Sequence, residues 1–537
     1  MPATALNRAV SLCALMFLAL SAMAQRPTPL RPVQIDSGRI LGVLTPDQKV
    51  VAYKGIPYAQ PPVDDLRWRP PQPLGRWKKI FLAAAFGPRC IQSGTQPDMV
   101  FRDPGPSEDC LTLNVWAPVI AQPQKKSPSL PVMVWVHGGG FFNGGTSEGR
   151  QDGQFLAHRG VIVVSMNYRL GVFGFFAHPE LTAESANHAS GNYGLLDQAA
   201  ALAWVRRNIA AFGGDPANVT LFGESAGSSA VGIHMASPLT QGLFSKAIGQ
   251  SGADFPGPGR PRSPLAQAEQ AGAAWAERAF GTSKLFALRM LPAKEVLAAA
   301  MSTTIPAPRF GPVIDGYFLP DFLAPIFAAG KQAHIPLLAG WNANEAFPAK
   351  VPTADSFTVQ AHIDFGPDAL KFLAFYPAAT DAEAAQSAAD LAGDKFIAFT
   401  TWEWLEAQAK TGQAPVYRYF FSLASPGDRV HTPAMGAFHS DDIEYVFGTL
   451  DSRPGMAIRP EDRALSDLMQ QYWTNFARTG NPNGDPANST LPPWPAYAPA
   501  ASYPVMHLDA RPAAAPDTLR PRYLFLSTLW SRPTASQ

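Results

Sequence analysis

Ser225 lies in a five-residue pattern, Gly223-Glu224-Ser225-Ala226-Gly227, that is typical of a nucleophilic serine. An apolar run at residues 219–222 comes directly before the pattern, and small and apolar residues follow it at 228–235. This order predicts a strand, a tight turn and a helix. Such a turn holds the serine in a strained backbone conformation and exposes its hydroxyl group at the end of the strand. The chemistry expected there is attack on the carbonyl carbon of an acyl group.

A second match to the same pattern, Gly145-Thr146-Ser147-Glu148-Gly149, has the wrong surroundings for a nucleophile. At 44 glycines among 537 residues, about one chance match to this pattern is expected in every few such chains. The segment follows a loop of Gly and Asn instead of a strand, and it leads into the polar residues 150–152. We therefore predict a surface loop at Ser147 and a nucleophile at Ser225.

The nucleophile needs a base, a group that orients the base, and hydrogen-bond donors for the oxyanion. The loop His137-Gly138-Gly139-Gly140-Phe141, which follows an apolar run, can supply donors. It has few side chains, so its backbone N–H groups can approach a ligand closely. We expect the N–H groups of Gly139, Gly140 and Ala226 to form an oxyanion hole. The alternative is a glycine-rich turn that only tightens the chain.

From about residue 130 onward, apolar β-branched runs alternate with helical segments, which is typical of an α/β protein whose mostly parallel sheet is covered on both faces. A helix is expected over 197–212, where apolar residues recur at helical spacing before two glycines. Two Ala-rich stretches, at about 256–310 and 353–413, are expected to be helical insertions that shape the pocket above the carboxyl ends of the strands. Strands are expected at residues 131–136, 161–166, 219–222, 246–250, 335–339 and 416–421.

The amino terminus has the three regions of a secretory signal: Arg8, an apolar run over residues 10–20, and Ala22-Met23-Ala24. Residues 1–24 are therefore the expected signal peptide, and residues 25–537 the expected single catalytic domain. No later run is apolar enough to cross a membrane, which favours a secreted or periplasmic protein.

The net charge of the mature chain limits the kinds of partner that it can bind. Removal of Arg8 leaves 42 of the 43 basic residues against 42 acidic residues, which argues against nucleic acid or an anionic membrane surface as partner.

Cys13 leaves with the signal, and Cys90 and Cys110 remain as an even pair in a compartment that permits oxidation. We expect a disulfide, with two free buried thiols as the alternative. Two isolated cysteines lack the paired spacing of a zinc site, and we predict no metal.

Several further segments resemble those of the type-B carboxylesterases, a group of α/β-hydrolases that includes the cholinesterases. The resemblance covers nearly the whole mature chain. In chain order, the matching segments are YKGIPYA at 53–59, EDCLTLNV at 108–115, NYRLG at 167–171, GNYGLLDQ at 191–198 and PVIDG at 312–316.

The resemblance implies the chain order serine, acid, histidine for the catalytic residues. Four histidines follow the region of the acid: His362, His431, His439 and His507. Spacing alone does not choose among them, although His507 lies in a strand-like run typical of a core residue. The segment FHSDDIEYVFG at 438–448 matches the catalytic histidine segment of the family, which points to His439.

By the same resemblance the acid is Glu345, at the end of an expected strand, although Ala346 follows it where the family has glycine. Alanine would tolerate a positive φ poorly at that position. Glu224 is expected to face the pocket and Ser251 to support the acid by a hydrogen bond. Asp442, close to the histidine in sequence, is the rival carboxylate.

These residues predict hydrolysis of small or medium carboxylic esters through an acyl-enzyme, with no metal or organic cofactor. An amidase or peptidase would use the same machinery, so it stays an alternative. A second alternative is a non-catalytic binding protein of the kind that the family also contains. The physiological ester, the oligomeric state and the choice between periplasm and medium stay open.

Overall fold

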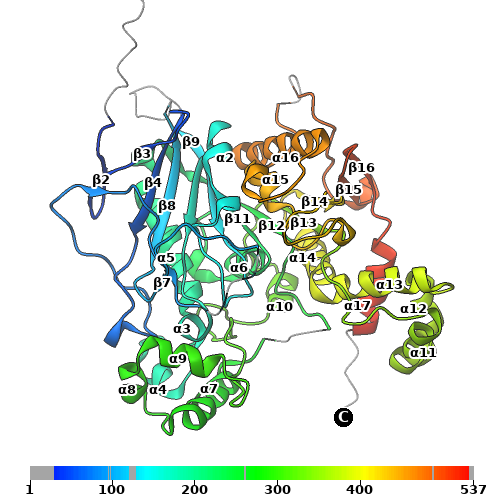
Figure 1. The fold of residues 1–537 in the computed structure, drawn as a ribbon, viewed down its shortest axis with the longest axis horizontal. Helices are drawn as coiled ribbons and strands as arrows, with labels where there is room; N and C mark the ends of the chain where they lie inside the picture. The colour runs from blue at the N-terminus through cyan, green and yellow to red at the C-terminus, as the bar shows by residue number, and fades with distance from the viewer. Residues whose placement is uncertain are drawn as a thin grey trace, which may run out of the picture.

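An eleven-stranded sheet forms the centre of the molecule (Figure 1). The computed structural model describes residues 30–92, 94, 96, 98–119, 129–258, 262–485 and 489–530. The predicted signal peptide, residues 1–24, lies outside the described residues. In order across the sheet the strands are β16 (Ala513–Pro516), β15 (Pro504–Leu508), β14 (Val416–Phe421), β13 (Leu337–Asn342), β12 (Lys246–Gln250), β11 (Gly214–Glu224), β9 (Leu130–Val136), β10 (Ile162–Met166), β8 (Thr112–Pro118), β4 (Val50–Pro57) and β3 (Val43–Leu44).

The middle of the sheet is parallel and its two edges are antiparallel. Strands β10, β9 and β11 to β15 pair in parallel, as the alternation of strands and helices predicts. At the edges, β8, β4 and β3 on one side and β16 on the other pair antiparallel. Two smaller sheets consist of β1 (Val33–Ile35), β2 (Gly38–Leu41) and β5 (Phe81–Leu82), and of β6 (Arg89–Cys90) and β7 (Pro106–Ser107).

All six predicted strands are present: two have the predicted bounds, two differ by one residue at one end, and two differ by more. The strand expected at 335–339 is β13, Leu337–Asn342, and the strand expected at 219–222 is the carboxyl-terminal part of the longer β11. The helix expected at 197–212 is α5, Tyr193–Asn208, continued by a short 3-10 turn that ends at Gly213 with φ of 88°. The edge strands β3, β4, β8 and β16 were not predicted, because antiparallel edge strands lack the intervening helices that mark the parallel core.

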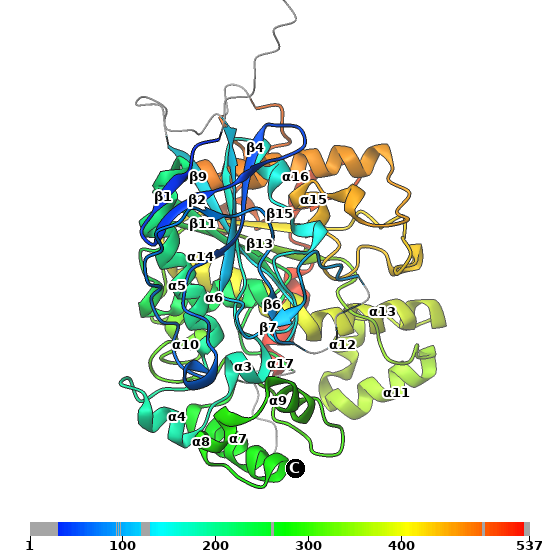
Figure 2. The ribbon, with the colours of Figure 1, turned by 60° about the vertical axis from the view of Figure 1, so that its left-hand side comes forward.

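Helices cover both faces of the sheet (Figures 1 and 2). One face packs against α5, α6 and α14, and the other against α2, α15 and α16. The helices are α2 (Gln154–His158), α3 (Gly171–Phe175), α4 (Pro179–Glu184), α5 (Tyr193–Asn208), α6 (Ala226–Ala236), α7 (Leu265–Phe280), α8 (Leu285–Met290), α9 (Ala293–Ala300), α10 (Leu323–Ala328), α11 (Ala354–Phe365), α12 (Ala369–Phe375), α13 (Asp381–Gly393), α14 (Phe399–Thr411), α15 (Ile443–Phe447), α16 (Pro460–Thr479) and α17 (Arg520–Trp530).

Strand β9 shows why the parallel strands read as continuous apolar runs. Successive side chains of a strand point to opposite faces. Val132 and Val134 accordingly pack in the core of the α5 and α6 face, while Met133 and Trp135 pack in the core of the α15 and α16 face. Both faces are covered by helices, so both sets must be apolar. All four side chains are fully buried.

The two predicted insertions differ in what they contribute. Residues 256–310 include α7, α8 and α9, which pack with α3 and α4 in a cluster of their own at the lower edge of Figure 1. Residues 353–413 were predicted to be insertion throughout, and this is wrong for α14. That helix packs against β13 and β14, and the ring of Trp404 occupies the space that a side chain at Gly249 would need. Sequence patterning missed this because a helix on the sheet and a helix beyond it have the same spacing.

Cys90 and Cys110 are joined by a disulfide, with Cα atoms 4.9 Å apart. Both residues are buried. The bond closes a loop of about twenty residues, three of which, Gln96, Asp98 and Met99, line a cavity of about 870 Å³. The predicted pairing is therefore confirmed.

We predict that the double variant Cys90→Ala/Cys110→Ala unfolds more easily than the wild type by about 3 kcal/mol, because the unfolded chain regains the freedom of the closed loop. Chemical denaturation of the two proteins measures the difference. Mass spectrometry of a non-reduced digest should recover the linked peptide from the wild type. Recovery of both cysteines alkylated without reductant would contradict the bond.

Candidate active site

Ser225 occupies the tight turn between β11 and α6 that its surroundings predict. Its φ is 55° and its ψ is −120°, a strained conformation for a residue with a side chain. The turn is fixed by its neighbours, because the N–H of Ser225 donates to the carbonyl of Gln250 at 2.8 Å and its carbonyl accepts from Ser229. The strain therefore holds the hydroxyl group at the carboxyl end of the sheet.

The glycines around Ser225 are required by close backbone approach. A Cβ atom at Gly223 would lie 2.6 Å from the backbone of Gly227. A Cβ atom at Gly227 would collide with the carbonyl of Val136, at the end of β9. These contacts explain the spacing of the pattern: the helix can return beside the strand only where neither residue has a side chain.

His439 lies beside Ser225, although the two residues are 214 positions apart in the chain. His439 Nε2 is 3.0 Å from Ser225 Oγ, and His439 Nδ1 is 2.6 Å from Glu345 Oε2. A carboxylate only accepts hydrogen bonds, so Nδ1 carries the proton that it donates to Glu345. In the neutral ring, Nε2 then has the free lone pair that can take the proton of Ser225.

Glu345 is held by the backbone next to it. Its Oε1 accepts a hydrogen bond from the N–H of Asn342 at 2.6 Å. Its side chain is 1% exposed. The residue after it, Ala346, has no positive φ, so the departure from the glycine of the family causes no strain.

The loops that carry the acid and the histidine are joined side by side. Asn344 donates its backbone N–H to the carbonyl of Ala437 at 2.9 Å and accepts the N–H of Ala437 on its side chain at 3.1 Å. The side chain of Asn342 donates to the carbonyl of Phe438 at 2.8 Å. These contacts fix the distance between Glu345 and the histidine independently of either side chain.

Two expectations about the supporting residues need correction or restriction. Ser251 was expected to hydrogen bond the acid, and this is wrong, because its buried hydroxyl group bonds to no described residue. The rival carboxylate Asp442 bonds to Gln250, Tyr419 and Asn342 instead of the histidine. Asp442 therefore braces the ends of neighbouring strands.

The predicted oxyanion loop lies against Ser225. Gly139 and Gly140 have φ of 104° and 65°, and no described residue accepts a hydrogen bond from either N–H. A Cβ atom at Gly138 would lie 2.5 Å from Glu224 Oε2 and 3.1 Å from the Cβ of Ser225. One at Gly139 would collide with the carbonyl of Asn143. A valine at Gly139 would thus disturb the loop fold itself.

A cavity of about 870 Å³ opens above these groups. Ser225, His439, Glu224 and the three predicted oxyanion residues line it. Its apolar walls come partly from the ends of the two insertions, which the sequence could place near the pocket only in general terms. Side chains that sequence reasoning did not assign to the pocket include Met99, Phe142, Arg150, Phe255, Arg262, Phe396, His431 and Met435.

Glu224 and His439 influence each other's protonation. Glu224 Oε1 lies 3.3 Å from His439 Nε2, and the Glu224 side chain is 4% exposed. Burial raises the pKa of Glu224 to about 8, although the nearby histidine opposes this. Burial alone would lower the pKa of His439, but the carboxylates of Glu224 and Glu345 outweigh it and raise that pKa to about 9. Positive charge on the imidazole is thus favoured.

Ser147, in the second match to the nucleophile pattern, has a different set of partners from Ser225. The predicted surface loop is wrong, because Ser147 is 2% exposed. Its hydroxyl group donates to Asp103 at 2.5 Å, and Arg102 bonds to its carbonyl. The polar residues of this loop satisfy one another in the interior, which the composition of the segment does not reveal.

No group of three or more His, Cys, Asp or Glu side chains is arranged to hold a metal ion in the part of the chain that the structure describes. Within the same residues, no helix combines the length and apolar character that are needed to cross a membrane.

Comparisons with known proteins identify the family of the chain. A profile of the carboxylesterase family matches residues 30–525. Fumonisin B1 esterase of Sphingopyxis macrogoltabida is 38% identical over 501 residues, which cover 89% of this chain and 87% of that protein. Para-nitrobenzyl esterase of Bacillus subtilis (strain 168) is 37% identical over 483 residues, covering 87% and 92%. Acetylcholinesterase of Bungarus fasciatus is 33% identical over 533 residues, covering 91% and 84%.

Solved structures give the same result. Two structures of PNB esterase superpose with TM-scores of 0.76 and 0.74 at 34% identity, and each covers 93% of this chain and 100% of its own. The fold is therefore the α/β-hydrolase fold, as predicted. With the family profile and three relatives that are all esterases or cholinesterases by name, the chain belongs to the carboxylesterase family and is an ester hydrolase.

Proposed function

We propose that the protein hydrolyses carboxylic esters through a covalent acyl-enzyme on Ser225. The observation that carries this proposal is the continuous chain of contacts from Ser225 Oγ to His439 at 3.0 Å and from His439 to Glu345 at 2.6 Å. This series of contacts begins at Ser225, which lines the cavity of about 870 Å³. A nucleophile, its base and the group that orients the base are the parts that acyl transfer needs.

In the first half of the reaction, Ser225 Oγ attacks the ester carbonyl while His439 Nε2 takes its proton. The C–O bond of the ester then breaks, and His439 returns the proton to the leaving alcohol. Glu345 keeps the proton of the ring on Nδ1 and offsets the positive charge that forms. Water repeats the sequence on the acyl-enzyme, which releases the acid and restores Ser225.

The carbonyl oxygen becomes negative during both steps. The N–H groups of Gly139, Gly140 and Ala226 are the proposed donors for it. They line the cavity beside Ser225, and donors of this kind contribute most where water is excluded. Glu224, beside the same imidazole, adds a further stabilising partner for the transient positive charge.

The substrate is proposed to be a small or medium ester, because the cavity has the size and the mixed apolar and polar walls typical of a small-molecule site. Amide hydrolysis by the same residues is the second candidate. A non-catalytic binding role is less favoured, because Ser225, His439 and Glu345 are all present and in contact. We also propose that the protein is exported, since its disulfide is compatible with an oxidising compartment.

The proposed nucleophile can be tested against a matched control, Ser147. Ser225→Ala should retain its fold and lose esterase activity by about 10⁴ to 10⁶-fold, since it removes the attacking atom. Ser147→Ala carries the same change in the same five-residue pattern. It should keep its kcat while losing about 1 kcal/mol of stability with the buried hydrogen bond to Asp103. Steady-state hydrolysis of p-nitrophenyl butyrate and thermal unfolding test both, and the reverse order of activities would refute the assignment.

The second prediction separates the two carboxylates. Glu345→Gln should lose most of its kcat with KM little changed, because an amide cannot balance the imidazolium and can hold the wrong tautomer. Asp442→Asn should reduce kcat by less than about tenfold, since Asp442 contacts other residues than the histidine. If kinetics gave a crippled Asp442→Asn and a mild Glu345→Gln, the orienting acid would be Asp442.

The third prediction concerns pH. Only neutral His439 can accept the proton of Ser225, so kcat/KM should rise with pH through a pKa above the ordinary value of 6.5. Glu224→Gln removes a carboxylate that stabilises the imidazolium, so the ring should lose its proton at lower pH. The acidic limb should move down by on the order of one pH unit. A pH profile of kcat/KM for both proteins measures this, and an unmoved limb would exclude the coupling.

A further inference from the structure

The segment that carries His439 is an irregular loop between β14 and α15, so side-chain contacts add to its join with the acid loop in holding it. Ser440, the next residue, has a φ of 71°, which is unfavourable for a residue with a side chain. Strain of this kind persists only where the surroundings hold the backbone in place. Arg150 supplies one contact, because its guanidinium donates to Ser440 Oγ at 3.3 Å.

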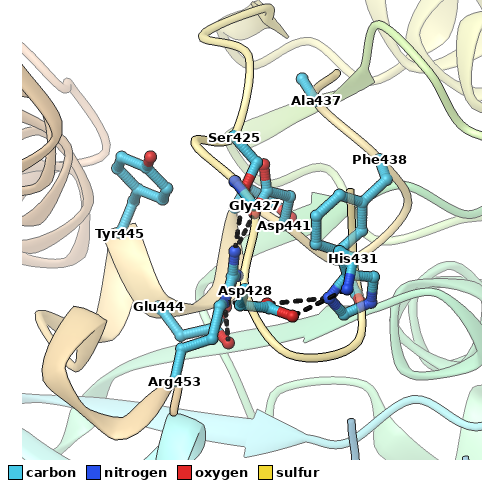
Figure 3. Close-up of polar contacts among 12 residues, drawn as sticks. Ser425, Gly427, Asp428, His431, Ala437, Phe438, Asp441, Glu444, Tyr445 and Arg453 are labelled. Carbon is cyan, nitrogen blue, oxygen red and sulfur yellow. Dashed lines mark hydrogen bonds and ion pairs between the residues drawn. The ribbon is translucent and has the colours of Figure 1, made fainter. Parts of the chain in front are cut away.

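Arg453 supplies a second set of contacts after His439 (Figure 3). Its side chain is 7% exposed and reaches two carboxylates of this segment. Nη1 is 2.5 Å from Asp441, two residues after His439, and Nη2 is 2.8 Å from Glu444, in α15. One guanidinium group therefore binds two of the carboxylates that follow the histidine.

The same guanidinium also reaches the residue before His439. It lies 5.3 Å from the ring centroid of Phe438, and its Nε is 3.5 Å from Asp428. Asp428 in turn accepts a hydrogen bond from His431 Nδ1 at 2.9 Å. The ring of His431 lies over that of Phe438 (Figure 3), and the two stack with centroids 3.9 Å apart and planes 13° apart.

Arg453 and Asp428 do not belong to the described residues that line the active-site cavity. They line a neighbouring cavity of about 610 Å³, together with Phe438 and Glu444. His431 lines both cavities. A substrate that fills the active-site cavity would therefore meet neither Arg453 nor Asp428, so Arg453 would act on turnover through the residues that it holds.

We propose that Arg453 is a positioning residue for the reaction: it fixes the imidazole of His439 by holding Phe438 on one side and Asp441 on the other. The inference rests on the proposed role of His439 as the base. We call Arg453, Asp428, His431, Phe438, Asp441 and Glu444 the Arg453 cluster. A displacement of about 1 Å in the base can lower a rate by about 10²-fold, which sets the scale of the expected effect.

Stability alone does not account for the cluster. Three carboxylates surround one guanidinium, and Asp441 Oδ2 has no hydrogen-bond partner among the described residues. Burial raises the pKa of Asp441 to about 7, although Arg453 opposes this. Apolar residues of similar size often stabilise a fold as well as a buried ion group does. A charged group retained at this cost is consistent with a need for a defined geometry.

The test compares two variants of Arg453 in the full-length mature protein. Arg453→Met alone would leave three buried carboxylates without their cation, so the first variant is the triple variant Arg453→Met/Asp441→Asn/Glu444→Gln. It removes the cation together with two of the three carboxylates and leaves Asp428 bonded to His431. We expect its kcat for p-nitrophenyl butyrate to fall by about 10 to 100-fold, with KM within about threefold of the wild type. Arg453→Lys keeps the charge but not the planar fork of donors, so its kcat should lie between those of the wild type and the triple variant.

Arg463→Met is the matched control. Arg463 pairs with Asp451 on the surface, where the two side chains are 58% and 72% exposed, and it lies on α16 close to the cluster in sequence. Its kcat and KM should equal those of the wild type. Thermal unfolding is measured for every variant. A midpoint well above the assay temperature shows that turnover is measured on folded protein.

The outcomes separate this inference from the proposed function. Loss of kcat at constant KM, with partial recovery in Arg453→Lys, supports positioning. A folded triple variant with kcat within about twofold of the wild type would overturn it, as would a raised KM at unchanged kcat. If the triple variant fails to fold, Arg453→Lys decides by the same criteria. Should Ser225→Ala and His439→Ala remain active in the same assay, the proposed function itself would be wrong.

Discussion

One imidazole ring links the parts of the site, because each of its two nitrogens must meet a partner from a different segment. The hydrogen bond from His439 Nδ1 to Glu345 spans 94 residues of chain, and the contact from Nε2 to Ser225 spans 214. Neither contact can form unless three loops end at the same edge of the sheet. The parallel register of β11, β12, β13 and β14 provides that edge, since parallel strands present their carboxyl ends together.

The sheet alone brings the loops near one another, and backbone contacts complete the geometry. The strained turn at Ser225 is held by Gln250 at the end of β12. The acid and histidine loops are joined through Asn342 and Asn344, so their separation does not depend on the flexible side chains that react. The main chain therefore holds the site in place before a substrate binds. Little reorganisation is then needed when the substrate arrives.

Local features of the sequence predicted a large part of this arrangement. The nucleophile turn is encoded within about ten residues by glycines that permit close approach, so Ser225 could be recognised without any tertiary information. His439 and Glu345 could be chosen only through the resemblance to a family, because the chain separates them widely. Contacts between distant side chains were out of reach: Ser251 lacks its expected bond, Ser147 is buried, and the Arg453 cluster has no motif. The helix α14 was misassigned for a related reason, since periodicity does not say what a helix packs against.

The join between the acid and histidine loops also bears on how the family can diversify. The stretch from α11 to α13 leaves the sheet after Glu345 and returns before α14, so it is an excursion between two points that stay fixed to the sheet. Ala392, near the end of α13, lines the cavity, and the hydrogen bonds that join the two loops involve no residue of α11 to α13. The turn that follows α13 differs, because its Phe396 packs edge to face on His439 with ring centroids 5.1 Å apart. Changes confined to α11 to α13 can therefore alter the shape of the binding site while the hydrogen bonds between the acid and histidine loops stay in place. The architecture thus separates a helical excursion from the pair of joined loops, which is a physical basis for evolvability.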